Sequence, residues 1–163
     1  MTQENTPWLL LVLSLPTQSA TARMRIWRAL KALGCGALRD GAYLLPDKPN
    51  CRQHFNDLLD ETLREGGSAW LLTVHAQSGA ESDAFRLLFA REDDYVQLVQ
   101  SLTAARTILA GLTAQEITRA MRKMRRDYEA LRNIDYYPND ASAQAEAAWM
   151  DFIDAAETCL SPG

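Results

Sequence analysis

The stretch Ala22–Pro46, ARMRIWRALKALGCGALRDGAYLLP, decides the fold of the N-terminal part of the chain, because it encodes one helix followed by one hairpin. Its first half repeats apolar residues at the spacing of a helix, in which successive side chains turn by about 100°. These apolar residues are Ile26, Trp27, Leu30 and Leu33. The opposite side carries the cations Arg25, Arg28 and Lys31. We therefore expect an amphipathic helix over residues 22–33 with a basic outer face.

The second half of the stretch has the features of a hairpin. Gly34 and Gly36 supply a stop directly after the helix. Asp40-Gly41 then lies between short apolar segments, and this dipeptide is a strong short-range signal of a hairpin turn. Pro46 ends the second strand, because proline lacks the N–H group that pairing requires.

Further apolar segments flank this core. Residues 8–15, WLLLVLSL, lie between two prolines and are typical of a central strand. Residues 51–63 show helical spacing and are followed by Gly66-Gly67, and residues 69–76, AWLLTVHA, predict another strand. The order is βαββαβ. It predicts an α+β, ferredoxin-like fold, in which a four-stranded antiparallel sheet carries two helices on one face.

The remainder of the chain has no further strand signal and predicts a helical bundle. Apolar residues within 95–112 alternate in steps of three and four, which is a heptad-type seam. Thr113 and Glu116 have the spacing of a capping box, and a second helix with a similar seam follows them. We expect these two helices to form an antiparallel hairpin. A third helix, around residues 145–156, has an acidic outer face.

Length and composition limit the protein class. The chain has 163 residues, of which 47% are apolar, so it can form a packed core, and we divide it into a ferredoxin-like domain, residues 1–78, and a helical bundle, residues 79–163. No run approaches the ~18 apolar residues of a membrane span, and no signal peptide is evident. We therefore expect a cytoplasmic protein without membrane contact. The three cysteines lack CxxC spacing, which favours reduced, mostly buried thiols.

Charge is unevenly distributed. The net charge of −4 argues against indiscriminate binding to polyanions, so nucleic acid must be contacted by a local patch. Besides the three cations of the first helix, a dense cluster lies on the second long helix: Arg119, Arg122, Lys123, Arg125 and Arg126. Both sets predict contacts with DNA phosphates. The alternative is a solvated face whose cations pair with the acids of the third helix, Asp151, Asp154 and Glu157.

A small anion site is predicted where the first helix begins. Thr17 and Ser19 offer hydroxyl groups beside free backbone N–H groups, and Arg23 lies one turn inside the helix. These donors would suit an oxyanion. The alternative is that Thr17 or Ser19 only caps the helix and that Arg23 pairs with a carboxylate.

No catalytic constellation is evident. His54 and His75 lie on different predicted elements, without further ligands at metal-binding spacing. The chain also lacks GxSxG, HExxH and a glycine-rich phosphate loop. We therefore predict no catalytic residue, no metal site and no cofactor.

The runs WLLLVLSLP, residues 8–16, and TARMRIWRALKALGCGALRDGAYLLP, residues 21–46, resemble the N-terminal domain of the chromate-resistance regulator family, ChrB. The helical continuation resembles that family less specifically. More distantly, the βαββαβ order is similar to the PaaX-type repressors and to the small CRISPR-associated spacer-acquisition nucleases. The resemblance implies a cytoplasmic, homodimeric regulatory domain linked to transcription of a chromate-efflux operon. Chromate is then the oxyanion expected at the predicted anion site.

Two departures from these families bear on function. The nucleases carry a metal-binding aspartate at the end of their first strand, whereas residues 12–15 here read VLSL, so we do not expect an enzyme. Regulators of this type continue into a second domain, so we expect either a short relative or an N-terminal portion. The predicted function is a chromate-responsive, DNA-binding regulatory domain. The alternative is a non-catalytic dimerisation scaffold whose heptad seams bury partner helices.

Overall fold

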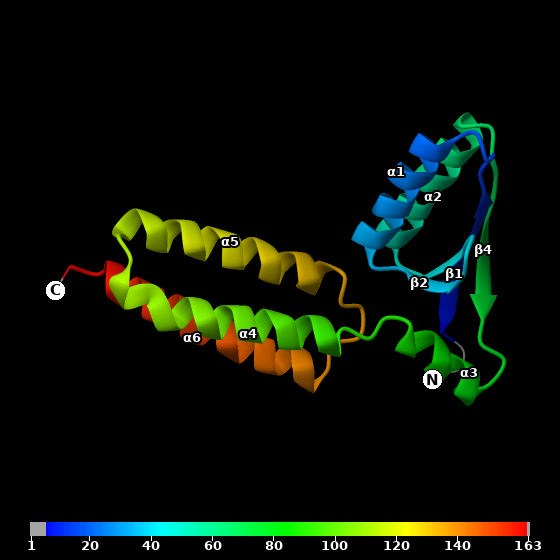
Figure 1. Cartoon of the computed structure of the whole chain (residues 1–163). Helices are drawn as coiled ribbons and strands as arrows, with labels where there is room; N and C mark the ends of the chain where they lie inside the picture. The colour runs from blue at the N-terminus through cyan, green and yellow to red at the C-terminus, as the bar shows by residue number, and fades with distance from the viewer. Residues whose placement is uncertain (1–5, 163) are drawn as a thin grey trace. The chain divides into compact units, whose positions relative to one another are not determined.

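The computed structural model describes residues 6–162 and divides the chain into two compact units, Met1–Ala90 and Arg91–Gly163. Figure 1 shows a sheet covered by helices in the first unit and helices alone in the second. The predicted mixed α/β class with a four-stranded antiparallel sheet is confirmed. Within residues 80–160 all described elements are helical, as expected. No helix in the described part of the chain is long and apolar enough to cross a membrane.

The first unit combines four strands with three helices. Its elements are β1 (Pro7–Ser14), α1 (Ala20–Leu33), β2 (Gly36–Arg39), β3 (Ala42–Pro46), α2 (Pro49–Arg64), β4 (Ser68–His75) and α3 (Gly79–Leu87). The strands lie in the order β2-β3-β1-β4, and every neighbouring pair is antiparallel. The long apolar strand β1 is therefore central, as its continuous apolar sequence predicted.

Alternation along β1 divides its side chains between the two faces of the sheet. Leu9 and Leu11 are fully buried on the face that α1 and α2 cover, together with Leu45 of β3. Ile26 of α1 and Phe55 of α2 are the matching buried residues from the helices. This apolar layer fixes the position of α1 over the sheet.

Trp8 lies on the opposite face of the sheet, where α3 covers one end. The ring of Phe85 meets Trp8 edge-on and the ring of Phe89 stacks on it, each with centroids 5.6 Å apart. Aromatic pairs in these geometries add stabilisation beyond their buried area. Helix α3 thus packs in the first unit, so the boundary falls after Ala90 and not after residue 78.

The predicted hairpin is confirmed. Its turn lies close to the last residues of β1. Gly41 has φ 84°, which glycine adopts without strain, and its carbonyl accepts a hydrogen bond from the Leu13 N–H at 2.9 Å. A β-carbon at Gly41 would lie 2.8 Å from the Leu13 carbonyl oxygen. The turn at Asp40-Gly41 is therefore held against the end of β1, near the start of α1.

The second unit is a three-helix bundle. Its elements are α4 (Glu92–Ile108), the short 3₁₀ turn η2 (Leu109–Gly111), α5 (Ala114–Asn133) and α6 (Asp140–Leu160). The predicted capping box is present: the Thr113 side chain accepts from the Glu116 N–H, and the Glu116 carboxylate accepts from the Thr113 N–H. The core contains the buried residues of all three helices, among them Leu102 and Phe152. The predicted helical bundle thus has a core of its own.

Tyr95 ties α4 to the segment between α5 and α6. Its hydroxyl donates a hydrogen bond to Asp135 Oδ2 at 2.6 Å, although the residue is almost fully buried. Burial, and then the hydrogen bond to the Asp135 carboxylate, raise the pKa of Tyr95 above its usual value near 10. The protonated phenol is therefore the form that the fold stabilises.

Replacing Tyr95 with phenylalanine is expected to lower the free energy of unfolding by about 1.5–3 kcal/mol, because the hydrogen bond to a charged acceptor is lost. Above pH 10 the unfolded state ionises this tyrosine while the folded state resists, so the wild type loses stability there as pH rises. The variant lacks this contribution. Urea melts at pH 7 and pH 11 test both effects, and an unchanged stability at pH 7 would contradict the role assigned to this bond.

Candidate nucleic-acid interface

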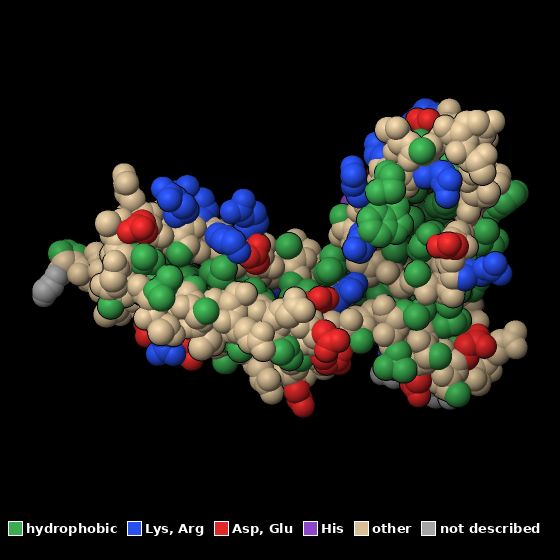
Figure 2. Space-filling model, in the orientation of Figure 1, with side chains coloured by type: hydrophobic (Ala, Val, Ile, Leu, Met, Phe, Trp, Pro, Cys, Tyr) green, Lys and Arg blue, Asp and Glu red, His purple; other side chains and the backbone are tan. Residues whose placement is uncertain are grey.

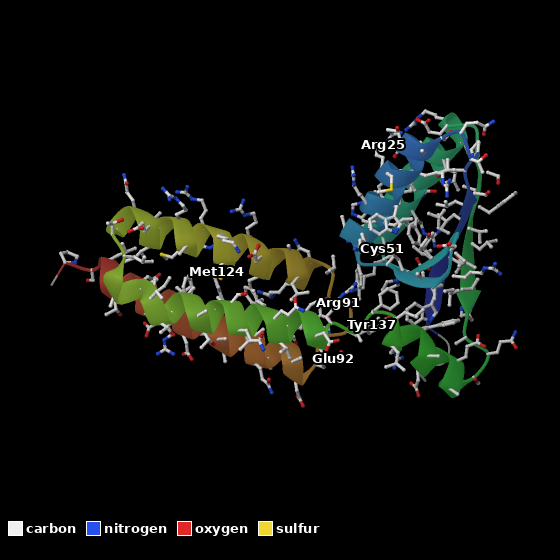
Figure 3. The ribbon with its side chains drawn as sticks, viewed as in Figure 1. Arg25, Cys51, Arg91, Glu92, Met124 and Tyr137 are labelled. Atoms are coloured by element: carbon white, nitrogen blue, oxygen red, sulfur yellow. The ribbon has the colours of Figure 1, made fainter. Side chains whose placement is uncertain are left out.

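Helix α5 buries one side and exposes the other. Ile117, Met124 and Tyr128 are buried toward α4 and α6, and Figure 3 shows Met124 directed between the helices. At about 100° per residue, the direction opposite this seam is occupied by four cations. We call them the basic stripe: Arg119, Arg122, Lys123 and Arg126. All four are exposed, and Figure 2 shows Lys and Arg side chains gathered along the outer side of α5.

The basic stripe has little internal neutralisation. Lys123 Nζ lies 2.9 Å from Asp127 Oδ2, and both side chains are solvent-exposed, so the attraction is weak. Within the described residues, the three arginines of the stripe form no ion pair. Exposed guanidinium groups that form no ion pair can contact phosphates without breaking one.

The expected alternative, pairing between α5 and the acids of α6, does not occur. In the part of the chain that the structure describes, no α5 cation forms an ion pair with Asp151, Asp154 or Glu157. These acids are exposed on their own helix. The reason is geometric: the stripe is opposite the seam through which α5 meets α6, so its side chains point away from that helix.

Arg125 does not belong to the stripe, although the sequence grouped it with the other four cations. Its guanidinium carbon lies 5.9 Å from the centroid of Trp149, a cation–π arrangement on the α6 side. Arg132 stands similarly over Tyr128 at 5.5 Å. Both arginines pack on the aromatic rings that hold α5 and α6 together, so their first role is structural.

The basic face of α1 is weaker than its sequence indicated. Arg25, labelled in Figure 3, donates hydrogen bonds from Nε to Glu61 of α2 and from Nη2 to Glu65 just after that helix, the second at 2.9 Å. These carboxylates, with Glu61 first, raise the pKa of Arg25 and offset its charge. Lys31 stands 4.7 Å above the ring of Trp27. Of the three predicted α1 cations, Arg28 is exposed and forms no ion pair within the described residues.

The predicted anion site coincides with a cleft of about 690 Å³ between the end of β1, α1 and the hairpin turn. Thr17 and Arg23 both line this cleft. Ser19 does not line it, and as the N-cap residue of α1 its side chain makes no capping hydrogen bond. Within residues 6–162, Arg23 has no carboxylate partner, so the expected alternative of a structural ion pair does not occur.

Asp40 also lines this cleft, which was not expected from the sequence. Its carboxylate opposes binding of a dianion, whereas Arg23 favours it. The aromatic rings of Trp27 and Tyr43 also line the cleft. The predicted hairpin could have indicated this position, because a turn at residues 40–41 places Asp40 at the same end of the sheet as the start of α1.

Other candidate groups form no site in the described residues. No cluster of three or more metal-ligating side chains is present there, and both histidines are exposed. In the described residues the three cysteines form no disulfide: Cys51 is buried, Cys35 is half-buried and Cys159 is exposed. The expectation of mostly buried thiols is thus wrong for Cys159, which follows the last buried residue of α6.

Comparisons with known proteins agree on one family. The family model described as "Protein ChrB, N-terminal" matches residues 23–158. Protein ChrB of Cupriavidus metallidurans is 45% identical over 158 residues, which are 97% of this chain and 49% of the relative. The chain therefore spans about half the length of that curated relative.

A solved structure, the uncharacterized protein Rv0674 from Mycobacterium tuberculosis, is similar with a TM-score of 0.51 and 16% identity. The match covers 94% of this chain and 62% of that one. At this identity the likeness concerns the fold alone.

Proposed function

This chain belongs to the ChrB protein family, and from that premise we propose that it is a transcription-regulatory unit of a chromate-resistance system that binds DNA through the basic stripe of α5. The observation that carries the proposal is the stripe itself, with three exposed arginines that lack ion-pair partners in the described residues. A DNA-binding role would place the protein in the cytoplasm. We also infer that the first unit is ferredoxin-like, which the sheet order β2-β3-β1-β4 supports.

The dimensions of the stripe suit a DNA backbone. From Arg119 to Arg126 the helix advances about 10 Å at ~1.5 Å per residue, which brings the four cations near a few successive phosphates. The acids of α6 point elsewhere and are repelled by DNA, so they favour the orientation in which α5 faces the duplex. Exposed Gln115 and Asn133 continue the same line along α5 and supply amides that can contact base edges.

Titration of labelled promoter DNA of a chromate-efflux operon tests the proposal. Neutralisation of four phosphates predicts that log affinity falls against log salt with a slope near −3.6, at about −0.9 for each phosphate. A duplex of scrambled sequence measures the part of the affinity that does not depend on DNA sequence. If this chain is instead a dimerisation scaffold, neither duplex will bind with a salt-dependent affinity.

We propose that chromate acts at the cleft lined by Thr17 and Arg23. The chromate dianion would accept hydrogen bonds from the Thr17 hydroxyl and the Arg23 guanidinium, with Asp40 keeping the affinity low. Sulfate has nearly the same shape and charge and should compete. The unpaired state of Arg23 in the described residues is what favours this site.

Replacing Arg23 with alanine is expected to weaken chromate and sulfate binding about tenfold or more, the equivalent of one charge-assisted hydrogen bond. Asp40→Asn should strengthen both, because it removes a repulsive charge. Isothermal titration of the three proteins measures these changes. Equal binding to the wild type and Arg23→Ala, or no binding to any of them, would move the chromate site away from this cleft.

A further inference from the structure

The two edges of the sheet differ in how they are protected against pairing with another strand. An exposed edge strand presents unpaired N–H and C=O groups, and proteins usually blunt it with shortness, charge or a bulge. Strand β2 has all three devices: it is four residues long, it carries Arg39, and its pairing with β3 shifts register between Ala37 and Arg39. The β2 edge is therefore poorly suited to accept a further strand.

Strand β4 has none of these devices. It is eight residues long, SAWLLTVH, without proline, lysine, arginine, aspartate or glutamate. All eight residues pair in unbroken register with β1. Figure 1 shows no strand or helix of the first unit along its outer side. Within the described residues, the outward backbone groups of β4 therefore have no partner.

Exposed apolar side chains accompany this open edge. Trp70 is 60% exposed and Leu72 is 47% exposed, and both lie on the face opposite α1 and α2. In the register they are paired with Val12 and Leu10 of β1, which are only half-buried. On this face, Phe85 of α3 and Phe89 just after the helix cover Trp8, which pairs with Val74 at the other end of β4 from Trp70. The edge and the face next to it thus form one uncharged apolar surface.

We propose that β4 pairs with β4 of a second copy of this chain, antiparallel, to give a continuous eight-stranded sheet. The chemistry of the edge selects this partner. A row of backbone donors and acceptors is satisfied by another extended strand, and an antiparallel strand related by a two-fold axis is complementary to itself. Because β4 itself carries no charged residue, its own side chains add no like-charge repulsion between two copies.

Symmetry restricts the register of this pairing. A two-fold axis perpendicular to the sheet keeps the helices of both copies on one face, and directly opposed residues must then lie on the same face. Near the centre of β4, only two registers satisfy this condition. One places Trp70 opposite Leu72, and the other places Leu72 opposite its own counterpart and Trp70 opposite Val74. Both create apolar cross-strand pairs, which stabilise a sheet.

The expected interface is small. An edge of this length with its flanking side chains buries on the order of 1,000 Å² in total, at the low end of specific interfaces. We therefore expect a reversible dimer with a dissociation constant in the micromolar range.

Sedimentation of the chain from about 1 to 200 μM tests the proposal, with a range chosen to bracket a micromolar constant. The wild type should pass from monomer to dimer as its concentration rises. Leu72→Lys should remain monomeric, because it places two positive charges in the contact between the two β4 strands. Leu87→Lys is the matched control, since Leu87 is 74% exposed and belongs to α3, not to β4. It should dimerise like the wild type. Circular dichroism verifies that all three proteins are folded.

Disulfide trapping locates the pairing. In a background with Cys159→Ser and Cys35→Ala, Leu72→Cys should cross-link in the register that opposes the two Leu72 positions. The double variant Trp70→Cys, Leu72→Cys should also cross-link in the other register, in which Leu72→Cys alone should not. A wild type that is monomeric at every concentration would overturn the proposal, because β4 would then not pair with a second copy of the chain. A dimer that persists in Leu72→Lys would overturn it too, since the interface would lie elsewhere.

Discussion

Replacing the four cations of the basic stripe with glutamine is expected to flatten the salt dependence of DNA binding; these are Arg119, Arg122, Lys123 and Arg126. The slope of log affinity against log salt should fall in magnitude by about 3 to 4. The affinity near 0.1 M salt should fall on the order of a thousandfold. The physical reason is the release of counterions, because each neutralised phosphate frees a condensed cation. Glutamine retains polarity and helix propensity, so α5 should persist. Fluorescence anisotropy with labelled promoter DNA at several salt concentrations measures both quantities.

A control variant must change the net charge equally. Arg39, Lys48, Arg64 and Arg106 are exposed cations outside the stripe, and their joint replacement with glutamine removes the same four charges. We expect this control to retain most of the slope. An equal loss in both variants would mean that DNA responds to the overall charge of the protein and not to the stripe.

Truncating Phe152 to alanine is expected to lower the free energy of unfolding of the second unit by about 3–5 kcal/mol, because it leaves a cavity in a packed core. Phe152 is fully buried and its ring lies 6.2 Å from that of Trp149. DNA affinity should fall as well at temperatures where the variant unfolds, although no cation is changed.

The matched control for this variant is Met150→Ala on the same helix. Met150 is 62% exposed, so its truncation should alter stability by no more than about 0.5 kcal/mol. Urea melts followed by circular dichroism compare the two. Similar midpoints for both variants would show that Phe152 is not a core residue.

Local signals predicted most of the secondary structure. The Asp40-Gly41 turn and the capping box of Thr113 and Glu116 depend on residues a few positions apart, and both are present. The buried residues of α5 also follow from periodicity, because one side of a helix must face its neighbours. The basic stripe could be recognised for the same reason, since it lies directly opposite that seam.

Contacts between distant segments could not be read from these patterns. The packing of α3 depends on Trp8, whose burial requires Phe85 and Phe89 from the far end of the first unit. Similarly, the carboxylates that offset Arg25 come from α2 and the residue that follows it, and the ring beneath Arg125 comes from α6. Arg125 and Arg126 look equivalent in sequence, but Arg125 packs on Trp149 whereas Arg126 is free of such a contact in the described residues and can reach a phosphate.

We propose that DNA lies against the outer side of α5. Iron–EDTA attached to a single introduced cysteine cleaves DNA near its own position, so it identifies the face that meets the duplex. Ala130→Cys continues the line of the stripe, and Asp154→Cys places the probe on the acidic side of α6; both positions are exposed. The background carries Cys159→Ser and Cys35→Ala, which leaves only the buried Cys51 of the native thiols. We predict localised cleavage of promoter DNA from position 130 and none from position 154. Cleavage from position 154 alone, or equal cleavage from both, would contradict a DNA interface on the basic stripe.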